Sequence, residues 1–276
     1  MQIVFSEKCL HYGEDHIESP ERVKKAKDIL YNLGYHFLEP QPATEKDLLK
    51  VHTKEYIEKL KKGSVGDMDT PPYDNIYDYA RLSAGGAVLA AQKQAFSLMR
   101  PPGHHAGREG VALGAPTQGF CYLNSIAVAV RHLGRKTLVL DIDGHHGNGT
   151  EDIFRGDKDV WFISLHGEYY PGTGRISAEN CINVTLPSSC GEEAYLRALD
   201  DALAQINLKE IEVVAVSAGF DAHKGDIASL GLTTEGFAKI GERIRKINKH
   251  TFFVLEGGYS GENLGKDINS LLRYDD

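Results

Sequence analysis

The ten residues Asp141-Ile-Asp-Gly-His-His-Gly-Asn-Gly-Thr150 decide how the rest of the chain is interpreted. They follow Lys136-Thr-Leu-Val-Leu140, a short apolar and β-branched run that is typical of a buried parallel strand. The expected strand delivers two carboxylates and two imidazoles at its carboxyl end, those of Asp141, Asp143, His145 and His146. A solvated Asp/Gly turn is the plain alternative. Four titratable side chains at the end of a buried strand are costly, however, unless they are paired or bind a metal.

The spacing within this stretch brings its polar side chains together. Residues two apart in a strand face the same way, so Asp141, Asp143 and His145 share one side if the chain stays extended that far. One of these side chains can then hold a metal ion while its neighbour orients the site. The glycines of the stretch allow the backbone to turn tightly and to approach a bound ion closely.

Length and composition favour one α/β domain over residues 1–276. Hydrophobic residues make up 41% of the 276 residues and charged residues 25%, with no Pro/Ser-rich linker that would divide the chain. The formal net charge of −8 and the lack of a basic stripe argue against binding to nucleic acid. The first residues do not resemble a signal peptide, and no apolar run approaches the ~20 residues of a membrane span. We therefore expect a cytoplasmic protein with reduced cysteines and with neither nucleic-acid nor membrane partners.

Strands and helices alternate along most of the chain, which predicts a mainly parallel sheet. Helices are expected over residues 20–33, 54–62, 75–94, 120–133, 192–206 and 233–247, and a last one begins near Glu262. Five of the expected apolar strands end near Met99, Leu140, Leu165, Ser217 and Leu255. A glycine-rich stretch with His, Asp or Tyr follows each of these five, and ligands of open α/β sheets bind outside the carboxyl ends of the strands. The sequence therefore predicts an active site at this edge of the sheet.

Three side chains from these stretches are the candidates for a metal site. Asp143 and His145 follow the strand that ends at Leu140, and Asp221 follows the strand that ends at Ser217. A catalytic zinc usually takes three protein ligands and leaves one position open for water. Because an Asp/His/Asp set is harder than a His-rich one, Fe²⁺ is an alternative to Zn²⁺. Such an ion lowers the pKa of its water and polarises a carbonyl group.

Two histidines and a tyrosine can supply the remaining chemistry. His104 and His105 lie on a proline-rich, stiff loop, and imidazoles titrate in the neutral range that general acids and bases need. Tyr259 follows two glycines and can donate a hydrogen bond to an oxyanion, although a packed core tyrosine explains its position equally well. Asp141 and Asn148 are the candidates to orient the two imidazoles.

Seven motifs along the chain resemble those of histone deacetylases, and they occur in the same order. The motifs are Arg-Pro-Pro-Gly-His-His (100 to 105), Gly-Phe-Cys-Tyr-Leu-Asn (119 to 124), the ten residues from 141 to 150, Ser-Leu-His (164 to 166), Pro-Gly-Thr-Gly (171 to 174), Ser-Ala-Gly-Phe-Asp-Ala-His (217 to 223) and Leu-Glu-Gly-Gly-Tyr (255 to 259). The resemblance spans nearly the whole chain. Asn148 and the Phe-Asp-Ala-His run are most similar to the class II and the bacterial or archaeal deacetylase-like branch.

The resemblance implies an arginase/deacetylase-type fold, in which a single parallel sheet is flanked by helices. It implies that the zinc ligands are Asp143, His145 and Asp221. It also implies a structural K⁺ ion, held by Asp141, Asp143, His145, Ser164 and Leu165.

The same resemblance assigns the catalytic roles. His105 is implied to be the main general base and acid, with His104 assisting. Tyr259 is implied to polarise the acetyl carbonyl. Asp141 would pair with His104, and Asn148 stands where the partner of His105 is expected.

A tunnel for the acyl-lysine side chain is also implied by the resemblance. Its expected lining includes Gly119, Phe120, Tyr170 and Gly257, with the two aromatic residues as its walls. Arg22 resembles an arginine that lines an internal acetate pocket, and an exposed helix arginine is the alternative for this residue.

We therefore expect a zinc-dependent deacetylase that acts on acetylated protein or peptide, or on a similar small N-acetyl amine. An acetylpolyamine deacetylase is the first alternative. A di-manganese ureohydrolase of related fold needs several more Asp ligands than Asp221 and His223 offer after the fifth strand. A non-catalytic acetyl-lysine binder would not need the complete set of catalytic side chains.

One position separates peptide from polyamine substrates. A second ammonium of a bound polyamine needs a carboxylate at the tunnel mouth, because an unpaired cation there loses its solvation. In polyamine-specific members that resemble this chain, a Glu follows a Gly-Asp pair downstream of the last metal ligand. The matching residue here is Ala228, which favours acetyl-lysine peptides, although the acidic loop 14–18 could supply a carboxylate from the other side.

Overall fold

The computed structural model describes residues 1–273 and is built around one eight-stranded sheet. The strands are β1 (Ile3–Val4), β2 (Phe37–Leu38), β3 (Phe96–Ser97), β4 (Thr137–Asp141), β5 (Val160–Gly167), β6 (Cys181–Leu186), β7 (Val213–Ala218) and β8 (His250–Leu255). They lie in the order β2-β1-β3-β8-β7-β4-β5-β6, and each neighbouring pair is parallel. The predicted parallel α/β sheet is therefore confirmed.

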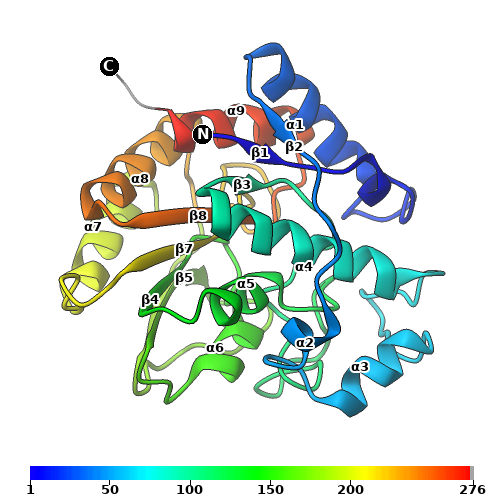
Figure 1. Cartoon of the computed structure of the whole chain (residues 1–276). Coiled ribbons are helices and arrows are strands. Elements are labelled where there is room, and N and C mark those ends of the chain that lie inside the picture. Colours follow the sequence, from blue (N-terminus) through cyan, green and yellow to red (C-terminus); the bar gives the residue numbers. More distant parts are fainter. Residues whose placement is uncertain (274–276) are drawn as a thin grey trace.

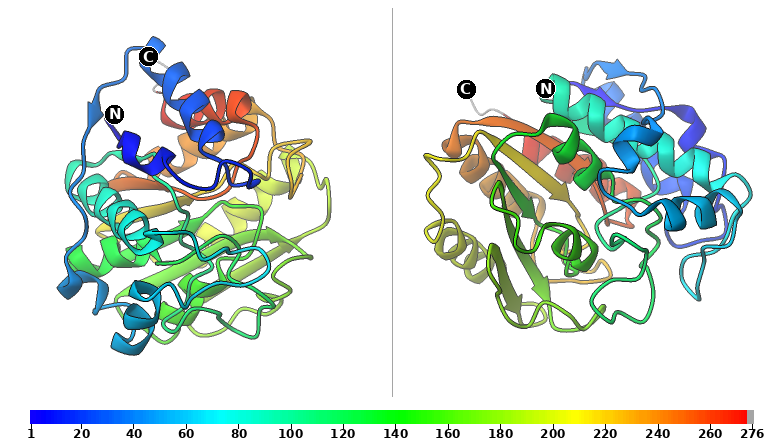
Figure 2. Two further views of the ribbon diagram at one scale, coloured as in Figure 1. Left: turned by 90° about the vertical axis from the view of Figure 1, so that its right-hand side faces the viewer. Right: turned by 60° about the horizontal axis from the view of Figure 1, so that its bottom comes forward.

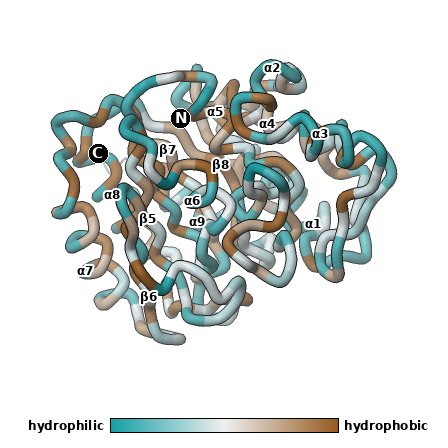
Figure 3. The backbone as a smooth tube through the Cα atoms, turned by 90° about the horizontal axis from the view of Figure 1, so that it is seen from below, coloured by the Kyte–Doolittle hydropathy of each residue, from teal (hydrophilic) through white to brown (hydrophobic). Residues whose placement is uncertain are grey.

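Helices cover both faces of this sheet, as Figures 1 and 2 show. They are the 3-10 helix η1 (Glu7–Leu10) and the α-helices α1 (Pro20–Asn32), α2 (Glu45–Leu48), α3 (Lys54–Lys61), α4 (Ile76–Lys93), α5 (Ser125–Leu133), α6 (Asn148–Phe154), α7 (Glu192–Leu203), α8 (Thr234–Ile247) and α9 (Gly261–Leu272). The outer helices alternate between hydrophilic and hydrophobic stretches in Figure 3, as amphipathic helices do. No helix among residues 1–273 is both long and apolar enough to cross a membrane.

The sheet carries a hydrophobic core on each face, because alternate residues of a strand point to opposite sides. In β4, Leu138 and Leu140 belong to the core beneath α1, α7, α8 and α9, whereas Val139 belongs to the core beneath α3, α4, α5 and α6. Strand β7 repeats the pattern, with Val214 in the first core and Ala215 in the second. Such near-continuous apolar strands are typical of a parallel sheet that is buried on both sides.

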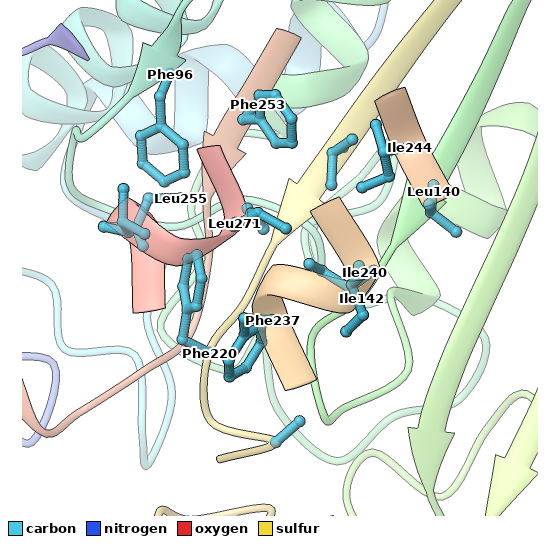
Figure 4. Packing of buried hydrophobic residues seen from close by; sticks show 14 of the residues in the cluster. Phe96, Leu140, Ile142, Phe220, Phe237, Ile240, Ile244, Phe253, Leu255 and Leu271 are labelled. Carbon is cyan, nitrogen blue, oxygen red and sulfur yellow. The ribbon is translucent and has the colours of Figure 1, made fainter. Parts of the chain in front are cut away.

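Aromatic rings fill the core beneath α8 and α9. The ring centroids of Phe220 and Phe237 are 4.9 Å apart, and Phe96 stacks on Phe253 at 6.1 Å. Figure 4 shows Phe220 beside Phe237, and Phe237 close to Ile240 of α8. Because Phe220 directly precedes Asp221, this packing fixes the start of the segment that carries that carboxylate.

The helix predicted over residues 120–133 begins later than expected, at Ser125. The reason is local: Gly119 and Phe120 have φ angles of +52° and +68°, which a right-handed helix does not allow. Asn124 then caps the helix, because its side-chain oxygen accepts a hydrogen bond from Ala127 N at 3.0 Å. Gly119 and Phe120 are thereby left outside the helix, where they line the cavity described below.

Helix α6 was not predicted from the sequence. Its first residues, Asn148 and Gly149, are poor helix formers, so local propensity gives no signal. Packing stabilises the helix instead: a Cβ at Gly149 would collide with the backbone of His105 and Ala106, so only glycine permits this approach. Thr150 N also donates a hydrogen bond to His104 O at 3.0 Å. The short helix is thereby attached to the loop that carries both histidines.

Candidate active site

The side chains that the sequence singled out meet at the carboxyl edge of the sheet. Strands β8, β7 and β4 are neighbours, so Tyr259, Asp221 and Asp143 follow adjacent strand ends. A cavity of about 160 Å³ is enclosed by Tyr259, Asp143 and residues from five other stretches, and Asp221 lies next to the cavity-lining Asp143 and His145. The lining residues are Asp69, Pro102, His104, His105, Gly119, Phe120, Asp143, His145, Tyr170, Ile227, Gly257 and Tyr259.

Asp143, His145 and Asp221 form a cluster in which one ligand atom of each lies within 4.8 Å of the others. The chain does not stay extended beyond Asp141, so simple strand alternation is not what joins them. Instead, Asp143 N donates to Asp141 Oδ1 at 3.1 Å, and His145 N donates to Asp143 Oδ1 at 2.8 Å. These turns direct His145 back toward the carboxylates.

The geometry of this cluster fits a bound cation. Asp221 Oδ2 lies 2.6 Å from His145 Nδ1, yet it makes no hydrogen bond within the described part of the chain. This carboxylate oxygen is therefore available to a bound ion, and His145 Nδ1, which also lies 3.2 Å from Asp143 Oδ1, is close enough to share that ion. Asp143 and Asp221 are at most 1% exposed, and two buried carboxylates within 4.8 Å of each other need a compensating positive charge. A Cβ at Gly257 would fill the space beside both carboxylates.

Each of the two adjacent histidines is held by a different partner. His104 Nδ1 donates to Asp141 Oδ2 at 2.9 Å, and His105 Nδ1 donates to Asn148 Oδ1 at 2.7 Å. The orientation of the Asn148 amide is fixed, because its nitrogen donates to Ala112 O at 2.9 Å. Nδ1 of His105 must therefore carry a proton, so that its neutral form leaves Nε2 unprotonated toward the cavity.

The two imidazoles differ in basicity. Burial lowers the pKa of His104, but the Asp141 and Asp143 carboxylates outweigh it and raise this pKa to about 10. Burial, followed by the positive charge of His104 and His145, holds the pKa of His105 well below its ordinary value. The geometry thus places a protonated imidazole beside a neutral one in the same cavity.

The segment Glu256–Tyr259 connects the loop that carries His104 and His105 with the carboxylate cluster. Glu256 is buried, and its Oε2 accepts hydrogen bonds from Gly103 N at 2.7 Å and from His104 N at 3.1 Å. Burial raises the pKa of Glu256 to about 7, against the lowering effect of His104. Gly257 N donates to Asp143 Oδ2 at 2.8 Å. The segment that carries Tyr259 is thereby tied to both the histidine loop and the carboxylate cluster.

Arg22 is buried, with 2% exposed, so its interpretation as an exposed helix arginine is wrong. Its guanidinium donates to Gly258 O and to Glu256 O, both at 3.0 Å, and lies 5.4 Å from the ring centroid of Tyr259. Arg22 is not among the residues that line the cavity; it lies behind the Tyr259 segment.

A second arginine joins this buried cluster. Glu18 Oε1 accepts hydrogen bonds from Arg22 Nε at 3.1 Å and from Arg100 Nε at 2.7 Å, and all three side chains are at most 3% exposed. Arg100 also donates to Cys9 O at 2.8 Å and to Tyr12 O at 3.2 Å. One carboxylate thus joins the first helix to the start of the histidine loop.

The four residues expected to form the tunnel all line the cavity. Tyr170 packs edge-on against His105 at 5.2 Å, and Phe120 packs edge-on against Tyr259 at 5.9 Å between centroids. Gly119 lies between these walls, and a Cβ there would collide with the His105 ring. The cavity is therefore narrow and has aromatic side walls.

The residues named for a potassium ion are neighbours in the sheet. Asp141 of β4 is the register partner of Ser164 of β5, and both are fully buried. Ser164 Oγ forms a 2.8 Å hydrogen bond with His166 Nδ1. Leu165 continues β5, while Asp143 lies beyond the end of β4.

Comparison with known proteins identifies the family. A family model described as "Histone deacetylase domain" matches residues 16–274. The chain belongs to the histone deacetylase family. This assignment confirms the resemblance of the seven motifs and makes the chain a deacetylase-type hydrolase, whose metal-dependent chemistry agrees with the clustered triad.

Relatives and solved structures agree with this assignment. A "Probable deacetylase" of Archaeoglobus fulgidus is 39% identical over 94% of this chain and 81% of its own length. "Acetylpolyamine amidohydrolase 1" of Pseudomonas aeruginosa is 36% identical over 72% of this chain and 61% of its own. The crystal structure of the HDA15 HD domain has a TM-score of 0.86 at 30% identity, covering 98% of this chain and 88% of that one. An acetylpolyamine aminohydrolase from Burkholderia pseudomallei reaches 0.88 at 26% identity, covering 98% and 97%.

Several residues of this deacetylase site escaped the sequence analysis. Asp69 lines the cavity, although the polar, proline-rich stretch around it, residues 66–73, is typical of an ordinary surface loop. Ile227 also lines the cavity, whereas the adjacent Ala228 is buried, with 2% exposed. Glu18 ends the acidic loop that could have supplied a carboxylate at the tunnel mouth. Its carboxylate is instead hydrogen-bonded to Arg22 and Arg100. Only Asp69 could have been suspected, from an acidic pair next to prolines.

The buried Glu18 cluster predicts a large effect on stability. We expect Glu18→Ala to lower the free energy of unfolding by ~3–5 kcal/mol, because it leaves two guanidinium groups buried without their carboxylate. Urea unfolding measures this change. The matched control is Glu193→Ala, which breaks an exposed ion pair with Arg197 and should change stability little. Equal losses in the two variants would contradict the structural importance of the cluster.

Proposed function

We propose that the chain is a zinc-dependent deacetylase that hydrolyses N-acetylated lysine side chains. One observation carries this proposal: the same cavity is lined by Asp143 and His145 of the Asp143/His145/Asp221 cluster, by two imidazoles with different hydrogen-bond partners and by Tyr259. Hydrolysis of an unactivated amide needs an activated water, a base that accepts its proton, an acid for the departing amine and a donor for the oxyanion. The cavity has a candidate for each of these needs.

In this proposal, Asp143, His145 and Asp221 hold the metal ion. When bound, a divalent ion there supplies Lewis-acid activation of the water and of the acetyl carbonyl. Two carboxylates and one imidazole form a ligand set that suits Zn²⁺, with Fe²⁺ as the alternative. Three protein ligands leave room for water and substrate on the cavity side, where Gly257 has no side chain.

His105 is the proposed base. Its Nε2 is unprotonated because Asn148 fixes the proton on Nδ1, and burial together with His104 keeps the ring neutral. It takes the proton of the attacking water at Nε2 and later delivers it to the departing amine. His104, held protonated by Asp141, stabilises the negative charge that develops nearby.

Tyr259 is the proposed donor to the oxyanion. Burial and the Asp221 carboxylate hold the pKa of Tyr259 well above its ordinary value, so the hydroxyl keeps its proton. Its ring lines the cavity and packs against Phe120, which places it beside the path of the acyl chain. Departed acetate would pass toward Arg22, behind the Tyr259 segment, and a structural K⁺ would bind at Asp141 and Ser164.

The cavity suits the thin alkyl chain of an acetylated lysine, because Phe120 and Tyr170 wall it from two sides. At Ala228 there is no carboxylate, and the neighbouring Ile227 offers an apolar surface, which favours a peptide. Asp69 supports a second candidate function, the deacetylation of acetylpolyamines, because its carboxylate lines the cavity and could accept a substrate ammonium. The amidohydrolase relative carries this activity in its name. We propose one cytoplasmic domain in either case.

The metal ligands give the first test. We expect Asp221→Ala to lose its bound metal and nearly all deacetylase activity, because two remaining ligands cannot enforce the geometry. Metal content is measured by mass spectrometry of the purified protein. Asp201→Ala, which removes an exposed carboxylate from α7, should keep both properties. One tightly bound zinc and normal turnover in Asp221→Ala would show that the site is misassigned.

The role of Tyr259 gives the second test. Tyr259→Phe removes only the hydroxyl, so we expect kcat to fall by ~10²–10³ while KM changes little. Steady-state kinetics with an acetyl-lysine peptide measure both constants. Tyr31→Phe, at an exposed position of α1, serves as the control. A raised KM with unchanged kcat would make Tyr259 a substrate contact instead.

The substrate class is tested by direct comparison. We expect kcat/KM for an acetyl-lysine peptide to exceed that for N-acetylputrescine, because the mouth has Ile227 and a buried Ala228 where a polyamine needs a carboxylate. The two constants are measured with the same enzyme preparation. A tenfold preference for the polyamine, about 1.4 kcal/mol in transition-state binding, would favour the second candidate.

A further inference from the structure

Asp226 contacts the backbone of the proposed oxyanion donor directly. Its Oδ2 accepts a hydrogen bond from Tyr259 N at 3.0 Å and another from Ser260 N at 3.2 Å. Its Oδ1 accepts from Ile227 N at 2.7 Å. One partly buried carboxylate therefore binds the peptide groups of two cavity-lining residues, Tyr259 and Ile227, which lie 32 positions apart in sequence.

The position of Tyr259 depends on such contacts because two glycines precede it. Gly258 has a φ of +112°, a conformation that other residues rarely adopt, and a glycine pair leaves the following backbone free to move. Arg22 holds the segment upstream, through the carbonyls of Glu256 and Gly258. Asp226 holds it downstream, at the peptide nitrogen of Tyr259 itself.

The loop that carries Asp226 is built on the proposed metal ligand Asp221. Ser229 N donates to Asp221 O at 3.0 Å, and Asp226 N donates to His223 O at 3.0 Å. Gly225 N donates to Ser229 Oγ at 2.9 Å and closes the turn. A shift of Asp226 relative to Asp221 would therefore break hydrogen bonds inside this loop.

We infer that Asp226 is a positioning residue, which sets the distance between the Tyr259 hydroxyl and the centre held by Asp221. This inference rests on the proposed oxyanion role of Tyr259. A purely structural role, in which Asp226 only complements the amino terminus of α9, is the competing explanation. Helix α9 already has its own cap, because Ser260 Oγ accepts from Asn263 N at 3.5 Å.

A double-mutant cycle separates positioning from stability. We expect Asp226→Ala to lower kcat about 10- to 100-fold with KM and metal content nearly unchanged, because the hydroxyl is displaced but still present. In the Tyr259→Phe background, which has no hydroxyl to position, Asp226→Ala should cost less than about twofold. Losses that multiply in the double variant would overturn the inference.

Two further variants serve as controls. Asp226→Asn keeps one oxygen that can accept from Tyr259 N, so it should recover most of kcat. Ser260→Ala removes the cap of α9 but leaves both peptide nitrogens bound to Asp226, so it should lower the melting temperature and leave kcat unchanged. If Ser260→Ala reduces kcat as strongly as Asp226→Ala does, the effect belongs to the helix and the inference fails.

Hydrogen exchange tests the contact without any substrate. Asp226→Ala should accelerate amide exchange in a peptide covering residues 257–261, while a peptide covering 137–145 keeps the wild-type rate. Unchanged exchange at 257–261 would overturn the inference even in an active enzyme. If the wild-type protein deacetylates no N-acetyl amine, the proposed function fails, and accelerated exchange would still establish that Asp226 holds the Tyr259 segment.

Discussion

The burial of Asp143 and Asp221 side by side is the constraint on which the rest of the site depends. Two carboxylates without solvent repel each other and lose their hydration, so the surrounding chain must compensate them. Backbone N–H groups do part of this, from Gly144 to Asp221 and from His145 and Gly257 to Asp143. Small residues are required where these groups approach so closely, and one oxygen of Asp221 still has no hydrogen-bond partner among the described residues, as suits a ligand of the proposed cation.

The same charge arrangement explains why two adjacent histidines behave differently. A carboxylate partner raises the pKa of His104, whereas an amide partner only orients His105. If Asp141 and Asn148 were exchanged, the carboxylate partner would belong to His105, and His105 would be the protonated imidazole of the two. Glu256 adds a third buried carboxyl group near His104, after Asp141 and Asp143, and accepts a hydrogen bond from the backbone nitrogen of His104. The protonation pattern is therefore a property of the partners more than of the histidines.

Much of this arrangement could be predicted from the sequence, and the rest could not for physical reasons. Apolar runs followed by polar glycine-rich stretches identified the parallel strands, and Asp143, His145 and Asp221 meet as expected. The condition that the chain stays extended beyond Asp141 is not met, because side chains of Asp141 and Asp143 accept hydrogen bonds from nearby backbone nitrogens and turn the chain. Helix α6 gave no local signal, since it depends on contacts with residues distant in sequence, and Asp69 gave only the weak signal of an acidic pair next to prolines. The roles of His105 Nε2 as the base and of the Tyr259 hydroxyl as the oxyanion donor are still predictions.

The arginine cluster has a consequence for the order in which the protein can assemble. Arg22, in the first α-helix, bonds the carbonyls of Glu256 and Gly258, which are made more than 230 residues later. Contacts of such sequence separation form late, because the loop between them must first be closed. During synthesis the sheet can begin to grow well before the Tyr259 segment emerges. Until the end of the chain is made, the cluster of Glu18 and the two arginines lacks its hydrogen bonds to Glu256 and Gly258. A complete active site is therefore among the last features of the fold to form.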